Sequence, residues 1–128
     1  MPNTRTVMDM GQTLIDHCNR GEETALMQTY YSPDAVSVEA VEMPGMGREA
    51  KGLEAIMAKG EWWVNANEVH SQKLEGPFVH GDDRFSVIFD IDVTEKATGN
   101  RTQMREIATY YVENDKIIRE EFAYPLGS

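Results

Sequence analysis

The chain has 128 residues, with 22 acidic against 12 basic side chains and a formal net charge of −10 at pH 7. This length fits one domain, which we expect over residues 1–128, and allows a buried core without a disulfide or metal staple. The acidity opposes binding to a nucleic-acid backbone or to an anionic membrane, so we predict neither as a partner.

The compartment is inferred from the cysteine content and from the apolar segments. Cys18 is the one cysteine, which rules out an intrachain disulfide and favours a reducing compartment. Residues 1–5 lack the apolar run of a signal peptide, and no stretch approaches the ~20 apolar residues of a membrane span. We therefore expect a cytoplasmic protein.

Two helices are predicted at the start of the chain. Thr6 followed by Asp9 is typical of a helix start, with a hydroxyl cap and an acid in the first turn. Leu26 and Tyr30 lie four residues apart in a second, short helix that ends before Pro33. The apolar residues of the first helix recur at helical spacing: Val7, Met10, Leu14 and Cys18.

The middle of the chain is expected to hold a strand, a loop and a third helix. Residues 35–42 are predicted to be a strand in which Val36 and Val38 alternate with Ser37 and Glu39. Residues 43–52 are rich in glycine and are expected to form a loop. The apolar residues of the third helix are Leu53, Ile56, Met57, Gly60, Trp63 and Val64.

From Val69 onward the pattern changes to the period of two that is typical of strands. We predict strands over residues 69–75, 84–93, 102–112 and 116–124. Gly76-Pro77 is expected to end the first of them, His80 to lie in a turn, and Asn114-Asp115 to form a tight hairpin turn. The strongest alternation is that of Phe85, Val87, Phe89, Ile91 and Val93.

Helices that precede an antiparallel sheet favour an α+β fold in which the helices cover one sheet face. Long strands twist, so the sheet is expected to curl. We predict a cone-shaped half-barrel, with a curved and mostly antiparallel sheet wrapped around three N-terminal and central helices. Such a cone is expected to hold an apolar pocket for a small molecule at its open end.

Three side chains are candidate catalytic residues, because burial of an acid or a histidine among apolar strand residues costs free energy unless something compensates for it. Glu39 is a candidate pocket base, or else a solvent-facing strand residue. Glu106 is a candidate buried acid, or else a structural partner of a nearby arginine at position 101, 105 or 119. His70 is a candidate proton shuttle, or else an exposed strand histidine.

Aromatic side chains with an apolar body are candidates to line the pocket, although any one of them could equally belong to the core. Those that we single out as substrate-binding are Tyr30, Trp63, Tyr110, Phe122 and Tyr124. We expect no metal site, because the three histidines are scattered, and no cofactor, because no glycine-rich phosphate loop is present. Cys18 suits packing on an apolar helix stripe.

Four short phrases in chain order resemble those of SnoaL-like proteins in the nuclear transport factor 2-like superfamily. They lie at residues 19–22, 31–36, 52–56 and 114–118, so the resemblance extends over nearly the whole chain. It implies a cone-shaped α+β barrel and a homodimer through the outer sheet face. It implies little about the reaction, because the superfamily includes isomerases, dehydratases, cyclases, hydrolases and non-catalytic domains.

Within this superfamily, ketosteroid isomerase uses an Asp base with a Tyr and a protonated Asp as donors. Glu39 falls at the position of that base, whereas the donor positions fall on Leu14 and near Ala108. This argues against steroid isomerisation by that mechanism. The polyketide cyclases of the family use a carboxylate on a late strand, for which Glu106 and Glu120 are options.

Two functions therefore remain open. The first is an isomerase, lyase or cyclase that binds a small apolar molecule and uses a pocket carboxylate, Glu39 or Glu106, to move a proton next to a carbonyl. The alternative is a non-catalytic ligand-binding or dimerisation module, in which those carboxylates are ion-paired or exposed. A protein-adaptor role would need a broad exposed apolar patch.

Overall fold

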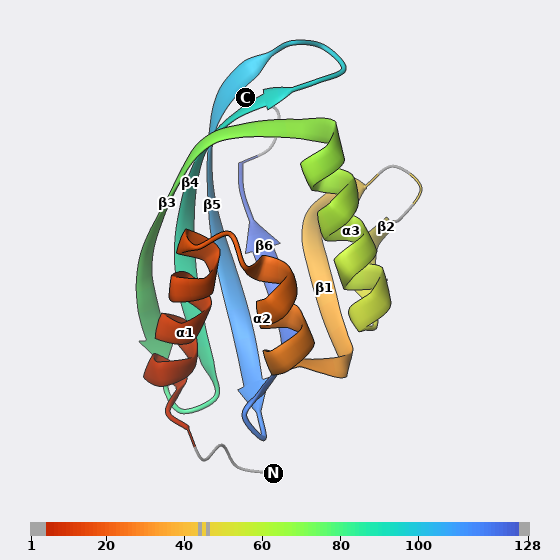
Figure 1. Cartoon of the computed structure of the whole chain (residues 1–128). Coiled ribbons are helices and arrows are strands. Elements are labelled where there is room, and N and C mark those ends of the chain that lie inside the picture. Colours follow the sequence, from red (N-terminus) through yellow and green to blue (C-terminus); the bar gives the residue numbers. More distant parts are fainter. Residues whose placement is uncertain (1–4, 44, 46, 126–128) are drawn as a thin grey trace.

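Three helices and six strands form the fold in the computed structural model, which describes residues 5–43, 45 and 47–125 (Figure 1). The helices are α1 (Val7–Asn19), α2 (Glu23–Tyr30) and α3 (Leu53–Ala66). The strands are β1 (Tyr31–Met43), β2 (Gly47–Lys51), β3 (Asn67–His80), β4 (Arg84–Glu95), β5 (Arg101–Glu113) and β6 (Lys116–Ala123). None of the helices in the described ranges is long and apolar enough to cross a membrane.

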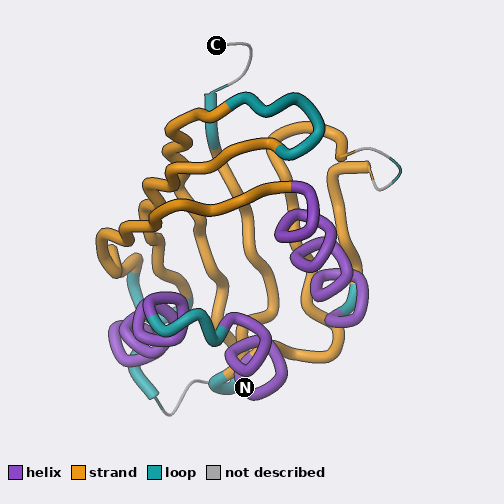
Figure 2. The backbone as a smooth tube through the Cα atoms, turned by 45° about the horizontal axis from the view of Figure 1, so that its top comes forward, coloured by secondary structure: helices purple, strands orange, loops and turns teal. Residues whose placement is uncertain are grey.

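All six strands belong to one sheet, in the order β2-β1-β6-β5-β4-β3. β1 and β6 run parallel, and the other neighbouring pairs are antiparallel. The sheet is curved and unclosed, and the helices lie on its concave side (Figures 1 and 2). The predicted α+β cone with a mostly antiparallel sheet is therefore confirmed.

The first helix forms as its sequence predicts. The Thr6 hydroxyl accepts a hydrogen bond from the backbone N–H of Asp9 at 3.1 Å and so caps the helix. One face is buried, including Met10 and Leu14, each 1% exposed. This face packs mainly against β3, where the Cα of Gly11 lies close to Pro77.

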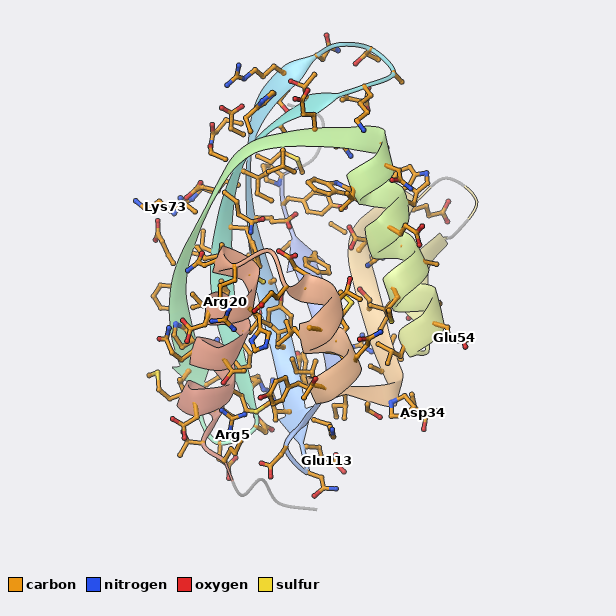
Figure 3. The ribbon with its side chains drawn as sticks, in the orientation of Figure 1. Arg5, Arg20, Asp34, Glu54, Lys73 and Glu113 are labelled. Carbon is orange, nitrogen blue, oxygen red and sulfur yellow. The ribbon has the colours of Figure 1, made fainter. Side chains whose placement is uncertain are left out.

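The core lies between the helices and the inner sheet face. Phe85 and Val87 on β4 and Ala108 on β5 are fully buried. The other face of β4 is wet, where Asp90 pairs with Arg105 at 2.6 Å and Asp92 with Arg101 at 2.8 Å. The expected half-buried strand is therefore confirmed, and side chains from the helices and the sheet project into the curve of the sheet (Figure 3).

The loop predicted over residues 43–52 is wrong in its second half. Gly47–Lys51 forms β2, which pairs antiparallel with β1 so that Ala50 lies opposite Ser37. Pro44 and Met46, which belong to the predicted loop, lie outside the described residues. A five-residue strand between glycines has no periodicity of its own, and its pairing with β1 decides its conformation.

The strand predicted to end at Gly76-Pro77 continues to His80, so the turn expected at His80 is also wrong. The register with β4 shifts between Glu75 and Phe78, and this irregularity accommodates Gly76 and Pro77 within the strand. Proline cannot donate to a strand ladder, but β3 is an edge strand, where the missing N–H costs little.

Candidate functional site

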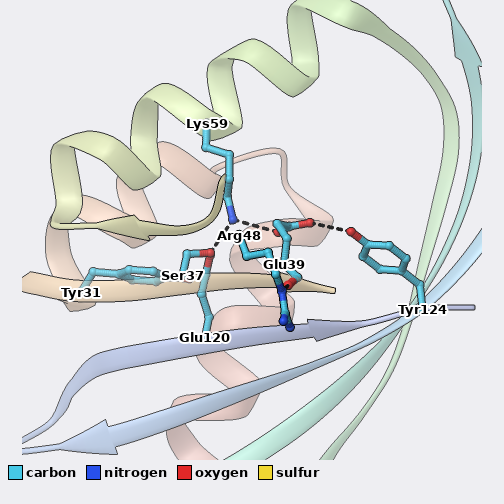
Figure 4. Close-up of polar contacts among 7 residues, drawn as sticks. All are labelled: Tyr31, Ser37, Glu39, Arg48, Lys59, Glu120 and Tyr124. Atoms are coloured by element: carbon cyan, nitrogen blue, oxygen red, sulfur yellow. Dashed lines mark hydrogen bonds and ion pairs between the residues drawn. The ribbon is translucent and has the colours of Figure 1, made fainter. Parts of the chain in front are cut away.

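A buried carboxylate, Glu120 on β6, lies at the centre of a polar cluster inside the cone (Figure 4). It is 3% exposed and accepts hydrogen bonds from the Tyr31 hydroxyl and, at 2.6 Å, from the Ser37 hydroxyl. Both donors lie on β1, the parallel neighbour of β6. Burial raises the pKa of Glu120 above its usual range, although the two hydroxyl bonds oppose this shift.

Lys59 on α3 connects this carboxylate to a second one. Its ammonium donates to the Ser37 hydroxyl oxygen and, at 2.8 Å, to Glu39 on β1. The side chains of Lys59 and Glu39 are only 11% and 14% exposed, so the ion pair is largely shielded from water. The Lys59 ammonium also lies 5.0 Å from the centre of the Phe122 ring, a cation–π contact.

The other end of Glu39 is held by Tyr124. The tyrosine hydroxyl donates to the second carboxylate oxygen at 3.1 Å, and the guanidinium of Arg48 donates to the Glu39 backbone carbonyl at 3.1 Å. Partial burial and the negative charge of Glu39 raise the pKa of Tyr124 to about 12. Its hydroxyl therefore stays protonated and available as a donor.

Glu106 on β5 is the third carboxylate, and it makes no hydrogen bond or ion pair with any described residue. The arginines expected as its partners bond elsewhere: Arg101 to Asp92, Arg105 to Asp90 and Arg119 to Glu121. Desolvation is the main cause that raises the pKa of Glu106 to about 7, followed by the charge of Glu39, while Lys59 opposes the shift.

Two buried tyrosines stay protonated beside these carboxylates. Tyr110 on β5 is the cross-strand partner of Glu120, is 4% exposed and stacks on Phe85 with ring centres 5.1 Å apart. Desolvation raises the pKa of Tyr110 and Tyr31 well above the usual range, with the charge of Glu120 as the next cause. Burial likewise raises the pKa of Cys18 to about 12, so its thiol stays protonated.

The structure brings together Glu39, Glu106, Tyr110, Phe122 and Tyr124 from the candidates that the sequence singles out. The remaining candidates are Tyr30, Trp63 and His70. Trp63 is half-buried on α3 and packs against the core, and Tyr30 contacts His17 edge-on and the guanidinium of Arg5. His70 is exposed on β3 and bonds to the Thr94 hydroxyl at 2.7 Å.

Sequence reasoning missed Lys59, Ser37 and Tyr31. Lys59 lies between Ile56 and Trp63 on the apolar side of α3, and a lysine in that place was the available signal. The alternation predicted for β1 is present, but its polar residues and not its valines face the interior. Ser37 is fully buried, whereas Val36 is half-buried.

Within residues 5–43, 45 and 47–125, no three or more His, Cys, Asp or Glu side chains are arranged to hold a metal ion. The side chains of the cluster offer one carboxyl that titrates near neutral pH, one ammonium and several protonated tyrosines.

Comparison with known proteins identifies the family. The family model for the SnoaL-like domain matches residues 6–124. The chain belongs to the SnoaL-like family. No curated protein matches it at a significant level.

Solved structures support this SnoaL-like assignment. A protein from Mesorhizobium loti, described as a candidate SnoaL-like polyketide cyclase, is 37% identical over 94% of this chain and 100% of that one, with a TM-score of 0.86. A nuclear transport factor 2-like protein from Burkholderia thailandensis is 17% identical over 95% and 92% of the two chains, with a TM-score of 0.81. A Mycobacterium tuberculosis protein in complex with estradiol-17β-hemisuccinate is 17% identical over 95% and 96%, with a TM-score of 0.74. The last two show the fold alone.

Proposed function

We propose that this SnoaL-like protein binds a small apolar carbonyl compound inside the cone and moves a proton at the carbon next to the carbonyl, with Glu106 as the group that takes and returns it. This is the chemistry of an isomerase, a lyase or a cyclase. The proposal depends on one observation above all, the unpaired and shielded carboxyl of Glu106.

The protonation state of Glu106 suits this task. A catalytic acid or base works best when its pKa lies near the operating pH, because both protonation states are then populated. With a pKa of about 7, Glu106 fulfils this condition. Glu39, by contrast, is held by Lys59 and Tyr124, so its oxygens are already occupied.

The surroundings of Glu106 also suit an apolar ligand. The same inner face of β5 carries Ala108 and Tyr110, and Phe122 on β6 lies opposite Ala108. Two of the similar structures are consistent with such a ligand. One is described as a candidate polyketide cyclase, and another holds a steroid hemisuccinate. These likenesses support the ligand class without naming the substrate.

Hydrogen–deuterium exchange at carbon tests the proposal without knowledge of the natural substrate. The probe is 2-tetralone, an apolar cyclic ketone, incubated with the protein in D2O while proton NMR follows the loss of its α-hydrogen signals. We expect the protein to accelerate exchange and Glu106→Gln to lower that acceleration by roughly 10²–10⁴-fold, the usual contribution of one general base.

The matched control is Glu54→Gln, the same change at an exposed position on α3. It should exchange at the wild-type rate. If Glu106→Gln also kept the wild-type rate, Glu106 would not be the base.

A non-catalytic binding module is the second candidate, and the Glu39–Lys59 ion pair favours it, because that role predicts paired carboxylates. Under it, 2-tetralone would raise the melting temperature without any acceleration of exchange. A ligand at about 100 times its dissociation constant stabilises a fold by ~2.7 kcal/mol, which a thermal-shift measurement detects.

A further inference from the structure

We propose that Lys59 is the group that binds the oxygen of the ligand, so that the site takes compounds whose oxygen becomes or already is negatively charged, such as an enolate or a phenolate. This inference rests on the proposed function and adds a role for a side chain that does not itself transfer the proton.

The first argument is the number of donors on Lys59. An ammonium group has three N–H donors. Two of them have acceptors in the described residues, the hydroxyl oxygen of Ser37 and the carboxylate of Glu39. The ammonium also lies over the face of Phe122, which attracts the charge but accepts no conventional hydrogen bond. One donor of a largely buried cation is therefore left for a ligand.

The second argument is how firmly Lys59 is held. The Ser37 hydroxyl donates its own proton to Glu120 at 2.6 Å, so its oxygen lone pairs are left to face the ammonium. Tyr31 donates to the same carboxylate from the other side. A donor fixed in this way needs little reorganisation when charge develops on a bound oxygen, which is the condition for effective oxyanion stabilisation.

The third argument is the relation of Lys59 to Glu106. The positive charge of Lys59 opposes the rise in the pKa of Glu106, and its ammonium lies over Phe122, which pairs across the sheet with Ala108 on the same face as Glu106. When Glu106 removes a proton from carbon, the electron pair of the broken C–H bond moves to the carbonyl oxygen. The resulting enolate oxygen would lie against the Lys59 ammonium, and return of the proton from Glu106 restores a neutral product.

Two probes with the same nitrophenyl body test this assignment by binding alone. The probes are 4-nitrophenolate, which carries an anionic oxygen, and 4-nitroanisole, which has the same aromatic body without the charge. The reference protein is Glu106→Gln, in which the competing negative charge of Glu106 is absent. We expect it to bind the phenolate at least roughly tenfold more tightly than the anisole, the difference that one charge-assisted hydrogen bond makes.

The decisive variant adds Lys59→Met and Glu39→Gln together to the reference protein, so that no carboxylate is left buried without its partner. It should lose the preference for the phenolate and keep its affinity for the anisole. Glu39→Gln alone, added to the same reference, should tighten phenolate binding, because it removes the anion that competes for Lys59. A purely structural Lys59 predicts no such gain.

The outcomes separate this inference from the proposed function. If the anisole binds but the phenolate has no advantage in the reference protein, or if the advantage survives the loss of Lys59, the role of Lys59 is overturned while an apolar site stands. If neither probe binds, the interior does not admit an apolar ring, and both the inference and the proposed function are overturned.

Discussion

Ser37 and Glu120 lie opposite each other in the parallel β1–β6 pair, and the serine hydroxyl donates a 2.6 Å hydrogen bond to the carboxylate. This contact joins residues 83 positions apart and places an acid in the centre of the inner sheet face. The buried acid is tolerated because its oxygens have donors.

Removal of this acid should destabilise the fold. In Glu120→Ala the hydroxyls of Tyr31 and Ser37 lose their acceptor inside the core, and unsatisfied buried donors together with a new cavity cost about 2–4 kcal/mol. Urea denaturation monitored by circular dichroism measures the change. Glu42→Ala, the same substitution at an exposed position of β1, should stay within about 0.5 kcal/mol of the wild type.

The pH dependence of stability should carry the signature of Glu106. Its pKa is about 7 in the folded protein against 4.5 for a free side chain, so the folded state binds the proton more tightly. Stability from this group is therefore fully present below about pH 4.5 and is lost as pH rises to about 7. The loss is at most about 3 kcal/mol.

Glu106→Gln removes this dependence, and the difference between the two denaturation series isolates it from the other acids. The free energy of unfolding of the wild type should fall relative to that of Glu106→Gln between pH 4.5 and 7. Parallel curves for the two proteins would show that Glu106 titrates normally.

Two helix glycines should respond in opposite directions to alanine. At Gly11 an added Cβ would lie 2.5 Å from the Pro77 Cβ, so Gly11→Ala must push α1 away from β3 and should cost about 1–3 kcal/mol. At Gly60 on α3 nothing lies within 4 Å of the added atom, so Gly60→Ala should gain up to about 1 kcal/mol from helix propensity. Differential scanning calorimetry measures both changes. Equal effects would contradict the tight packing of α1 on β3.

The homodimer expected from the family resemblance should form through the outer sheet face. Phe78 and Ile107 lie on this face, and they are 49% and 46% exposed. Ile107→Lys should shift the mass in light scattering from dimer to monomer, because a lysine there must be desolvated at the interface. Val64→Lys, on α3 at a position that is 60% exposed, should leave the mass unchanged. A monomeric wild type would refute the expectation.

Patterns between near neighbours were sufficient for most of the fold. The Thr6 cap, the alternation from Phe85 to Val93 and the Asn114-Asp115 turn, whose φ angles are 52° and 58°, all form as predicted. Each depends on the chemistry of a few consecutive residues. β2 and the end of β3 were mispredicted because their pairing partners, and not their own residues, hold them extended.

The sequence by itself determined the helices, the long strands and the cone fold, and it singled out Glu39 and Glu106 as candidates without deciding which way they face. Only the tertiary structure decided that Glu39 is paired with Lys59, that Glu106 has no such partner among the described residues, and that Ser37 links Lys59 to the buried Glu120. The reason is physical. A helix or strand is set by contacts within a few residues, whereas the pKa of a carboxyl depends on burial and on charges delivered by distant segments.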